Sequence, residues 1–376
     1  MEIVKVVRWA LAALVVAATI AWDPSGWYLG MAGAFAGLLV ELTVVQAGLA
    51  LGAVLFGLRI THVMIGLGSE LRSWTTDQRR IVLRSIPVLA SLSFTGLKPG
   101  VRRRTVLAGV TGIVVTALFV AATWLLTGSA FGKGLALAST ALLLLQLWPN
   151  EKPAHTSLGW FVFSLPRLSG RPLEEMEARP LVLAGMDAYH RGDIEAAERI
   201  HAEAAQRYPE LLTVIGLKVV TACAREKYLD ALQTVIGLSG RTDLSQRELA
   251  FVMATVAGVA AQAVESGQFP REVGLETAKN MLGNAYEAGY PRHRANGTLA
   301  LIALIEGQNA EARKLATWAA ENSEQALGRA DDLITIARAW MADGDNAKAR
   351  ALVAEAHELA GWYPRVAATR ARLDIS

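Results

Sequence analysis

The sequence predicts a mainly α protein, in which a multi-pass transmembrane helical bundle with a small membrane-associated β-region precedes a soluble α-solenoid. Long stretches of the first half are almost free of charge. Charges are also divided unevenly, because residues 1–170 carry 14 Lys/Arg and 6 Asp/Glu, whereas residues 171–376 carry 23 and 28. Small residues recur at a 34-residue spacing in the second half. We therefore expect a membrane domain over residues 1–168 and a helical-repeat domain over residues 169–376.

Four apolar runs are the predicted membrane spans. They cover about residues 3–22, 27–57, 104–127 and 134–149, each close to the roughly 20 residues that a helix needs to cross a bilayer. The first run also has features of a cleavable signal peptide, with Thr19-Ile20-Ala21 as a weak cleavage site. We favour an uncleaved helix, because Asp23-Pro24-Ser25-Gly26 is typical of a tight turn into the second run.

The distribution of cations predicts the orientation of these spans. With four spans, Asp23 and the single cation Lys133 fall on one side of the membrane. On the other side fall Lys5, Arg8, Arg59, Arg72, Arg79, Arg80, Arg84, Lys98, Arg102, Arg103, Arg104, Lys152 and Arg167. Because cationic loops are retained in the cytoplasm, we expect a plasma-membrane protein with both termini cytoplasmic. The Arg102–Arg104 cluster is interpreted as a topology anchor, and we expect no nucleic-acid partner.

Residues 58–97, between the second and third spans, predict a small β-region. The segments Arg59–Gly66 and Arg80–Pro87 are rich in β-branched residues, and Ser91–Phe94 forms a third short stretch. Glycine and proline interrupt the segment repeatedly. We expect three or four short strands against the cytoplasmic face of the bilayer.

Several short motifs keep a common order over about residues 29–168. They are Val40-Glu41-Leu42-Thr43-Val44 in the second span, Ile65-Gly66-Leu67-Gly68, Leu83–Pro87, Arg102–Arg104 before Ala108-Gly109, and Leu147-Trp148-Pro149 before Leu158-Gly159. In order and spacing the chain resembles the site-2 protease family of intramembrane zinc proteases. That family has an H-E-x-x-H helix, an I-G-x-G turn, an I-P strand, a basic run before an A-G-P helix, and a late N-x-x-P followed by D-G.

The zinc site that this resemblance implies has lost its ligands. The family's chemistry needs two histidines at i and i+4 on one helix face, a distant Asp as third ligand, and a Glu that acts as general base. Matched by position, Val40 and Val44 replace the histidines and Leu158 replaces the Asp, while Glu41 remains. Aliphatic side chains have no lone pair to donate. We therefore expect no metal, no cofactor and no catalytic residue.

The remaining potential ligands do not suggest a substitute site. His62 and His155 are the only histidines of the first half, and both fall in predicted cytoplasmic segments. We interpret each as a surface or interfacial residue, with a rebuilt zinc site as the alternative. The single cysteine, Cys223, excludes an intramolecular disulfide and a cysteine-based zinc site.

Two features of the second span are candidates for binding a transmembrane partner. Glu41 is one, because an ionisable residue inside a span suggests a functional site; the alternative, which we favour, is a relic of an ancestral catalytic residue. The second feature is the pair of Gly-x-x-x-Gly motifs formed by Gly33 and Gly37 and by Gly48 and Gly52. Such motifs allow close helix contacts, either within the chain's own bundle or with a partner's helix.

The second half predicts helical hairpins after a boundary at Ser169–Pro172. Gly192-Asp193, Ala197, Ala204 and Pro209 fall at the spacing of tetratricopeptide repeats. The pattern recurs in Tyr228 and Ala231, in Gly307, Ala312 and Ala319, and in Gly344-Asp345, Ala349 and Ala356. Residues 246–290 fit it poorly. Because such arrays form concave surfaces that bind peptides or helices, we expect a cytoplasmic protein or peptide partner.

These patterns favour a catalytically inactive member of the protease family, a pseudoprotease. It would act as a scaffold or regulatory subunit in the lipid bilayer, holding a partner's transmembrane segment and recruiting soluble partners through its repeats. The alternative is an active intramembrane zinc protease with unorthodox ligands. A small transporter is disfavoured, because the spans contain one ionisable group and no evident inverted repeat.

Overall fold

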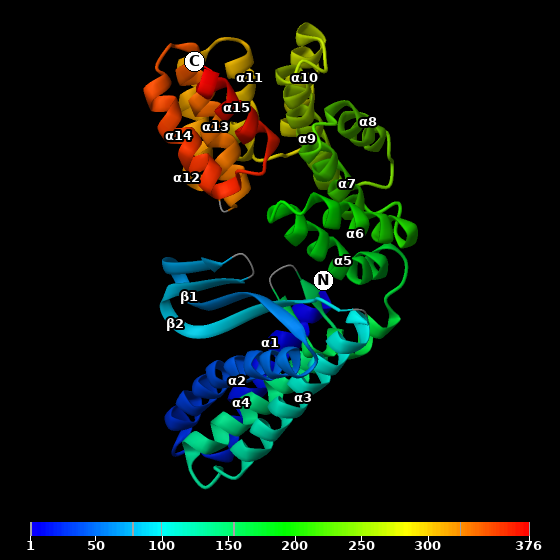
Figure 1. The fold of residues 1–376 in the computed structure, drawn as a ribbon. Helices are drawn as coiled ribbons and strands as arrows, with labels where there is room; N and C mark the ends of the chain where they lie inside the picture. Colours follow the sequence, from blue (N-terminus) through cyan, green and yellow to red (C-terminus); the bar gives the residue numbers. More distant parts are fainter. Residues whose placement is uncertain (1, 77–78, 99, 153–154, 324, 376) are drawn as a thin grey trace. The chain divides into compact units, whose positions relative to one another are not determined.

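The chain forms two compact units, Met1–Pro180 and Leu181–Ser376, which are drawn together in Figure 1. The structure, a computed structural model, describes residues 2–76, 79–98, 100–152, 155–323 and 325–375. The side chains of Lys5, Arg8, Lys152 and His155 lie outside the described part. As predicted, the chain is mainly α with a small antiparallel β-region.

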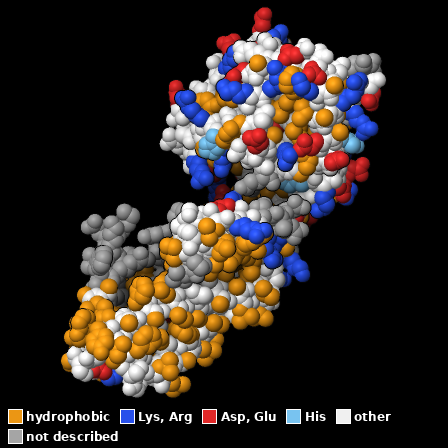
Figure 2. All heavy atoms as spheres, turned by 90° about the vertical axis from the view of Figure 1, so that its left-hand side faces the viewer, with side chains coloured by type: hydrophobic (Ala, Val, Ile, Leu, Met, Phe, Trp, Pro, Cys, Tyr) orange, Lys and Arg blue, Asp and Glu red, His pale blue; other side chains and the backbone are white. Residues whose placement is uncertain are grey.

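Unit 1 is built on long apolar helices. They are α1 (Glu2–Trp22), α2 (Trp27–Leu55), α3 (Val101–Trp124) and α4 (Ala130–Leu147). Helix α2 packs against both α3 and α4, and hydrophobic side chains cover much of the unit's helical surface (Figure 2). Four helices of the described chain, namely α2, α3, α4 and α9 (Gln246–Glu265), are long and apolar enough to cross a membrane, which indicates a multi-pass membrane protein.

Two apolar helices, α1 and α9, differ from the predicted set of spans. In α1 the described side chains form an apolar helical segment, Ala12–Trp22, that is shorter than a full span. Helix α9 was not predicted to be a span, and it belongs to unit 2, where it packs against its neighbours α8, α10 and α11. Half of its apolar window is buried in that unit. The core of unit 2 therefore accounts for the apolar composition of α9.

The ends of the bundle support the predicted order of the spans. Helix α4 begins at Ala130 rather than at residue 134, because the Ser129 side chain accepts a hydrogen bond from the backbone N–H of Gly132 and caps the helix. Lys133 thereby falls in the first turn, where its Nζ lies 3.1 Å from a carboxylate oxygen of Asp23. This ion pair places Asp23 and Lys133 at the same end of the bundle, as predicted.

The glycines of α2 pack closely against other helices of the same chain. A Cβ atom added to Gly33 would lie 1.9 Å from the carbonyl oxygen of Phe131, and one added to Gly37 would lie 2.8 Å from that of Leu135, both in α4. Added to Gly48 or Gly52, it would lie 3.0 or 2.6 Å from backbone atoms of α3. Both motifs thus pack within the chain's own bundle, which is the first of the two uses considered for these partner-binding candidates.

The β-region consists of two long bent strands, β1 (Leu58–Thr76) and β2 (Arg79–Gly96), which pair antiparallel. Residues 58–65 pair with residues 90–96, and residues 70–76 pair with residues 79–84. Residues 62–65 have additional partners at 80–83. Each strand thus contributes two short paired segments, in agreement with the prediction of three or four short strands.

A short connection returns the chain to the bundle after α4. It contains the two-residue strands β3 (Glu151–Lys152) and β4 (His155–Thr156), the π-helix η1 (Trp160–Ser164) and the 3₁₀-helix η2 (Leu165–Arg167). Leu158 and Leu165 are fully buried. Gly109 of α3 leaves space for Phe161, because an added Cβ would lie 2.5 Å from that side chain. The segment 158–168 therefore packs on the bundle.

The boundary between the units differs from the predicted one at residue 169. It lies between Pro180 and Leu181, inside α5 (Arg171–His190). Met176 and Arg179 of this helix line a cavity of unit 1. The helix starts directly after Gly170, so the Ser169–Pro172 turn marks the start of α5 and not the end of unit 1.

Unit 2 is a stack of helical hairpins. After α5 it contains α6 (Ile194–Arg207), α7 (Leu212–Ala224), α8 (Tyr228–Ser239), α9, α10 (Arg271–Glu287), η3 (Arg292–Ala295), α11 (Asn296–Ile305), α12 (Asn309–Asn322), α13 (Ala326–Ala342), α14 (Asn346–Ala360) and α15 (Pro364–Ile375). Alternate helices also stack, since α9 contacts α11, α11 contacts α13 and α13 contacts α15. This arrangement agrees with the predicted solenoid.

The repeated small residues lie where helices cross, as predicted. Ala197, Ala231, Ala312 and Ala349 are fully buried, whereas Ala319 is only half-buried. The turn residue Gly192 has a φ of 78°, and Glu226, one repeat later, adopts a similar left-handed conformation with a φ of 58°. Residues 246–290 fit the pattern poorly because α9 and α10, with 20 and 17 residues, are longer than α6, α7 and α8, with 14, 13 and 12.

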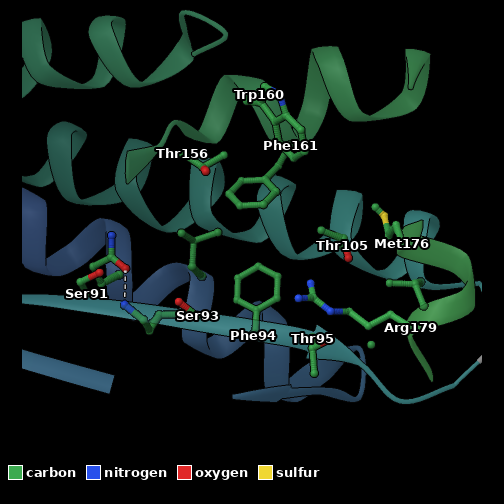
Figure 3. A pocket seen from close by; sticks show the side chains of 15 residues that line it. Ser91, Ser93, Phe94, Thr95, Thr105, Thr156, Trp160, Phe161, Met176 and Arg179 are labelled. Atoms are coloured by element: carbon green, nitrogen blue, oxygen red, sulfur yellow. Dashed lines mark hydrogen bonds between the residues drawn. The ribbon is translucent and has the colours of Figure 1, made fainter. Parts of the chain in front are cut away.

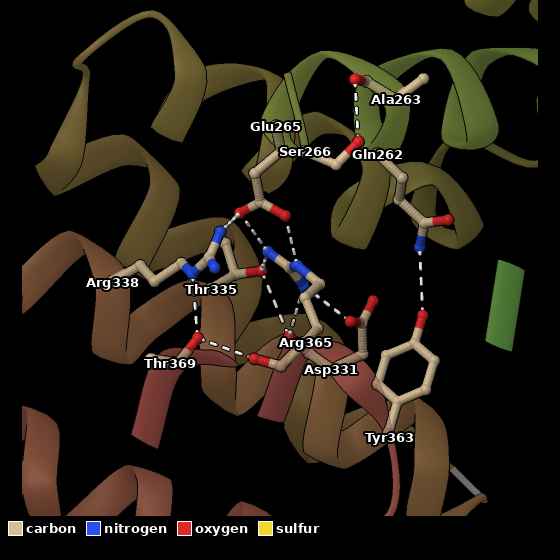
Figure 4. A network of polar contacts seen from close by, with 10 residues as sticks. All are labelled: Gln262, Ala263, Glu265, Ser266, Asp331, Thr335, Arg338, Tyr363, Arg365 and Thr369. Atoms are coloured by element: carbon tan, nitrogen blue, oxygen red, sulfur yellow. Dashed lines mark hydrogen bonds and ion pairs between the residues drawn. The ribbon is translucent and has the colours of Figure 1, made fainter. Parts of the chain in front are cut away.

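Residues near α15 join helices that are distant in sequence. Arg365 is 4% exposed and donates hydrogen bonds to Glu265 at the end of α9 and to Asp331 of α13 (Figure 4). The Trp362 ring lies 5.6 Å from that of Tyr189 in α5. Residues 362–365 therefore connect α5, α9 and α13, which are far apart in the sequence.

Replacing Gly33 by alanine is expected to destabilise unit 1 by about 1–3 kcal/mol, because the new methyl group meets a backbone carbonyl of α4. Gly128→Ala is the matched control, since nothing lies within 4 Å of a Cβ at that position. Unfolding of the purified protein in detergent measures both. Equal stability of the two variants would contradict the close packing of α2 on α4.

Candidate functional site

A cavity of about 280 Å³ lies in unit 1 between the β-region and the helices. Its polar lining comes from Ser91, Ser93, Thr95, Thr105 and Thr156, and its aromatic lining from Phe94, Trp160 and Phe161 (Figure 3). Six structural elements contribute side chains or backbone: α2, β2, α3, β4, η1 and α5. The cavity thus forms where the connection after α4 folds back on the β-region.

One wall of this cavity is the free edge of a strand. Residues 91–96 pair with β1 along one edge. The backbone N–H of Leu92 points the other way and donates a hydrogen bond to the Gln46 side-chain oxygen at 3.2 Å. Because alternate residues of an antiparallel strand direct their backbone groups to the same edge, Phe94 directs its N–H and C=O toward this edge as well. The cavity therefore borders backbone groups that β1 does not use.

Polar side chains around the edge retain hydrogen-bonding capacity. Thr95 is 7% exposed, and its hydroxyl has no partner among the described residues. The Arg179 side chain extends from α5 toward Phe94 and Thr105 (Figure 3). A buried hydroxyl without a partner is uncommon and costs free energy, so a bound group that donates or accepts a hydrogen bond here would be favoured.

Beside the cavity, three aliphatic side chains from two parts of the chain form one cluster. Val45 and Leu49 lie four residues apart on α2, and Leu158 follows α4. Their exposed fractions are 2%, 4% and 0%. The cluster shares its boundary with the cavity, because Leu49, Leu92, Phe94 and Phe161 contribute to both.

The structure does not bring the predicted set of Val40, Val44 and Leu158 together. Val40 is 45% exposed on the outside of α2, whereas Leu158 is fully buried. The residues at an i, i+4 spacing that meet Leu158 are Val45 and Leu49, five positions further along. A helix turns by about 100° per residue, so positions 40 and 45 face different directions. Leu158 thus packs against the second span through Val45 and Leu49, and Val40 takes no part in this cluster.

Glu41 is fully buried between α2 and α4. Neither carboxylate oxygen has a hydrogen-bond partner among the described residues, and the same holds for the hydroxyl of Ser139 on α4. Ser139 faces α2 at Gly37, one turn before Glu41. Because no surface of Glu41 is accessible, it is not available to a partner's helix in this arrangement, and its prediction as a partner-binding candidate is corrected.

Gln46 lines the cavity and was not among the predicted site residues. It follows Val45 directly, and its carboxamide connects α2 to the strand edge through Leu92. A carboxamide is neutral and does not take up a proton at neutral pH, so Gln46 cannot act as a general base. The signal in the sequence was the helical spacing of Gly37, Glu41, Val45 and Gly48, which places Val45 on the buried face.

The remaining candidate ligands are scattered. His62 lies on β1 and is half-buried. Cys223 is buried in unit 2, and burial raises the pKa of its thiol to about 12, which makes it a poor nucleophile. Within the described ranges, no group of three or more His, Cys, Asp or Glu side chains is arranged to hold a metal ion.

Comparison of the chain with protein-family models, with curated proteins and with solved structures finds no significant match. The family resemblance therefore rests on the sequence motifs alone.

A double-mutant cycle distinguishes the two faces of α2. Leu49→Ala and Leu158→Ala are expected to couple by about 0.5–3 kcal/mol, because their side chains share one cluster. Val40→Ala and Leu158→Ala are expected to be additive within about 0.5 kcal/mol. Reversible unfolding in detergent provides the free energies. Coupling of Val40 with Leu158 that equals or exceeds the Leu49 value would restore the predicted register.

Proposed function

We propose that this chain is a pseudoprotease that resembles the site-2 proteases, and that it holds a segment of a membrane partner without cleaving it. The observation that carries the proposal is the cluster of Val45, Leu49 and Leu158. It has the arrangement that the resemblance implies for a zinc site: two residues at i and i+4 on one helix and a third from a distant segment.

Under this proposal, the family's zinc-binding motif aligns five residues further along α2 than in our sequence alignment. Val45 and Leu49 stand for the two histidines, Leu158 for the Asp, and Gln46 for the general-base Glu. Aliphatic side chains cannot coordinate zinc, and a carboxamide cannot activate water as a base. All four chemical roles are then absent, and Glu41 has no part in the degenerate site.

The neighbouring cavity supports the binding half of the proposal. A strand edge with unused backbone groups recognises an extended peptide by adding it as a further strand. Phe94, Trp160 and Phe161 offer apolar contacts for its side chains, and the Thr95 hydroxyl offers a hydrogen bond. We propose that an extended segment of a transmembrane protein occupies this cavity.

Unit 2 supplies the second half of the proposed function. Its hairpins have the spacing of tetratricopeptide repeats, and its surface is charged and mixed in sign (Figure 2). We propose that it recruits a cytoplasmic protein or peptide. Since Trp362 and Arg365 are engaged by Tyr189 and Glu265 of the same unit, this partner would bind to other residues of unit 2.

A photo-reactive amino acid at Ser93, which lines the cavity and is exposed, tests the proposal in native membranes. We expect one defined protein adduct of full length. Thr105→Phe fills the cavity and is expected to abolish the adduct, because Thr105 also lines it. The control Leu118→Phe lies on the outer surface of α3, where Leu118 is 66% exposed, and is expected to leave the adduct unchanged.

Two results would contradict the proposal. One is an adduct that persists when the cavity is filled, because the partner would then bind elsewhere. The other is a cleaved form of the partner that appears only in cells containing this chain, because the bundle would then be an active protease.

A further inference from the structure

A second cavity, of about 360 Å³, lies within unit 2 and has an unusual concentration of arginine. It is bordered by Arg271, at the start of α10, by Arg338 of α13 and by Arg372 of α15. The one carboxylate of its lining is Glu265, at the end of α9. Val264, Leu304, Ile305 and Met341 supply the apolar remainder. Three cations from three helices therefore face one small space.

The carboxylates of this region are already engaged. Glu265 accepts from two arginines, lying 2.5 Å from Arg338 and 2.5 Å from Arg365 (Figure 4). Asp331 lies 2.7 Å from Arg365. Glu306, which follows Ile305, is paired with Lys279. Glu265, whose side chain is 10% exposed, and Asp331, whose side chain is 29% exposed, thus pair with Arg338 and Arg365.

Arg271 and Arg372 remain without a counter-charge. Among the described residues, neither has a carboxylate oxygen within 4.0 Å. Arg271 donates a hydrogen bond to the carbonyl oxygen of Ile305 at 2.7 Å, which holds it at the rim of the cavity. The cavity therefore has an excess of two positive charges.

Arg338 differs from a surface arginine because its side chain is nearly buried. Its side chain is 10% exposed, and its Nε donates to the Thr369 hydroxyl at 2.9 Å, which fixes the guanidinium plane. Burial lowers the pKa of Arg338, and the nearby charges of Arg365 and Arg372 act in the same direction. A bound anion would relieve this repulsion, and its attraction to the nearly buried Arg338 would be stronger than to the exposed Arg271 and Arg372.

We propose that this cavity binds a phosphate monoester group. A phosphate monoester carries a charge of about −1.5 to −2 at neutral pH and presents three acceptor oxygens. This charge matches the excess of two cations, whereas a carboxylate would neutralise only one. Guanidinium groups bind phosphate oxygens in a bidentate manner, which lysine cannot do. The volume of 360 Å³ lies at the small end of the range of about 300–1,000 Å³ for ligand pockets.

The phosphate has two possible sources, a small phosphate ester or a phosphorylated side chain of a protein. Both present the same group to Arg271, Arg338 and Arg372. The site is independent of the proposed function of unit 1, because all of its residues belong to unit 2.

Calorimetric titration of the full-length protein in detergent tests this inference. We expect saturable binding of O-phosphoserine and of inorganic phosphate, and no binding of serine or acetate at the same ionic strength. The double variant Arg271→Glu/Arg372→Glu is expected to lose affinity at least tenfold, which corresponds to about 1.4 kcal/mol. Arg372→Glu alone is a milder second variant, because Arg372 makes no hydrogen bond within the described chain.

The matched control is Arg247→Glu, which makes the same charge change at an exposed position of α9 far along that helix from Glu265. It is expected to bind phosphate like the unchanged protein. A phosphoserine peptide that binds more tightly than O-phosphoserine would identify a phosphoprotein as the source, and the reverse order would identify a small ester. Absence of saturable binding, or an equal loss in Arg247→Glu, would overturn the proposal.

Discussion

The architecture of unit 1 depends on the close approach of α2 to the helices on either side of it. Small residues without side-chain atoms at the crossing points allow this approach, because lipid provides no hydrophobic force between helices and packing must supply the attraction. Gly33 and Gly37 meet α4, and Gly48 and Gly52 meet α3. The face of α2 that these glycines define also carries Glu41, Val45 and Leu49.

This constraint decides what the centre of the bundle contains. Once α2 is held against α3 and α4, Val45 and Leu49 face the segment that returns after α4, and Leu158 fills the space between them. The same packing seals Glu41 away from any surface. Glu41, which matches a catalytic residue by sequence, is therefore a buried group of the helix seam. The aliphatic cluster of Val45, Leu49 and Leu158 lies further along α2.

Much of the fold followed from simple patterns in the sequence. Uninterrupted apolar runs predicted α2, α3 and α4, and the four-span topology correctly placed Asp23 and Lys133 together. The buried alanines at positions 197, 231, 312 and 349 lie at the predicted helix crossings. These features were predictable because they depend on local periodicity and on charge, which a single sequence displays directly.

The candidate site was harder to predict, because it depends on which face of a helix is buried. Glu41 is the one charged residue of the second span. We aligned the span to the family's motif through this residue because it is a glutamate, without considering which face of the helix is buried. The spacing of the glycines indicates which face of α2 is buried, but this becomes certain only from the packing of that face against α3 and α4. The arginine cavity of unit 2 was not predictable at all, since Arg271, Arg338 and Arg372 come from three helices with no common sequence pattern.

If Val45, Leu49 and Leu158 stand at the positions of three zinc ligands, as we propose, substitution by ligand residues at these positions should create a zinc site. A variant with Val45→His, Gln46→Glu, Leu49→His and Leu158→Asp is to be compared with a variant with Val40→His, Val44→His and Leu158→Asp, which retains Glu41. Elemental analysis of the purified proteins measures bound zinc. Our account predicts stoichiometric zinc in the first variant and none in the second or in the unchanged chain. Zinc in the second variant or in the unchanged chain would contradict it.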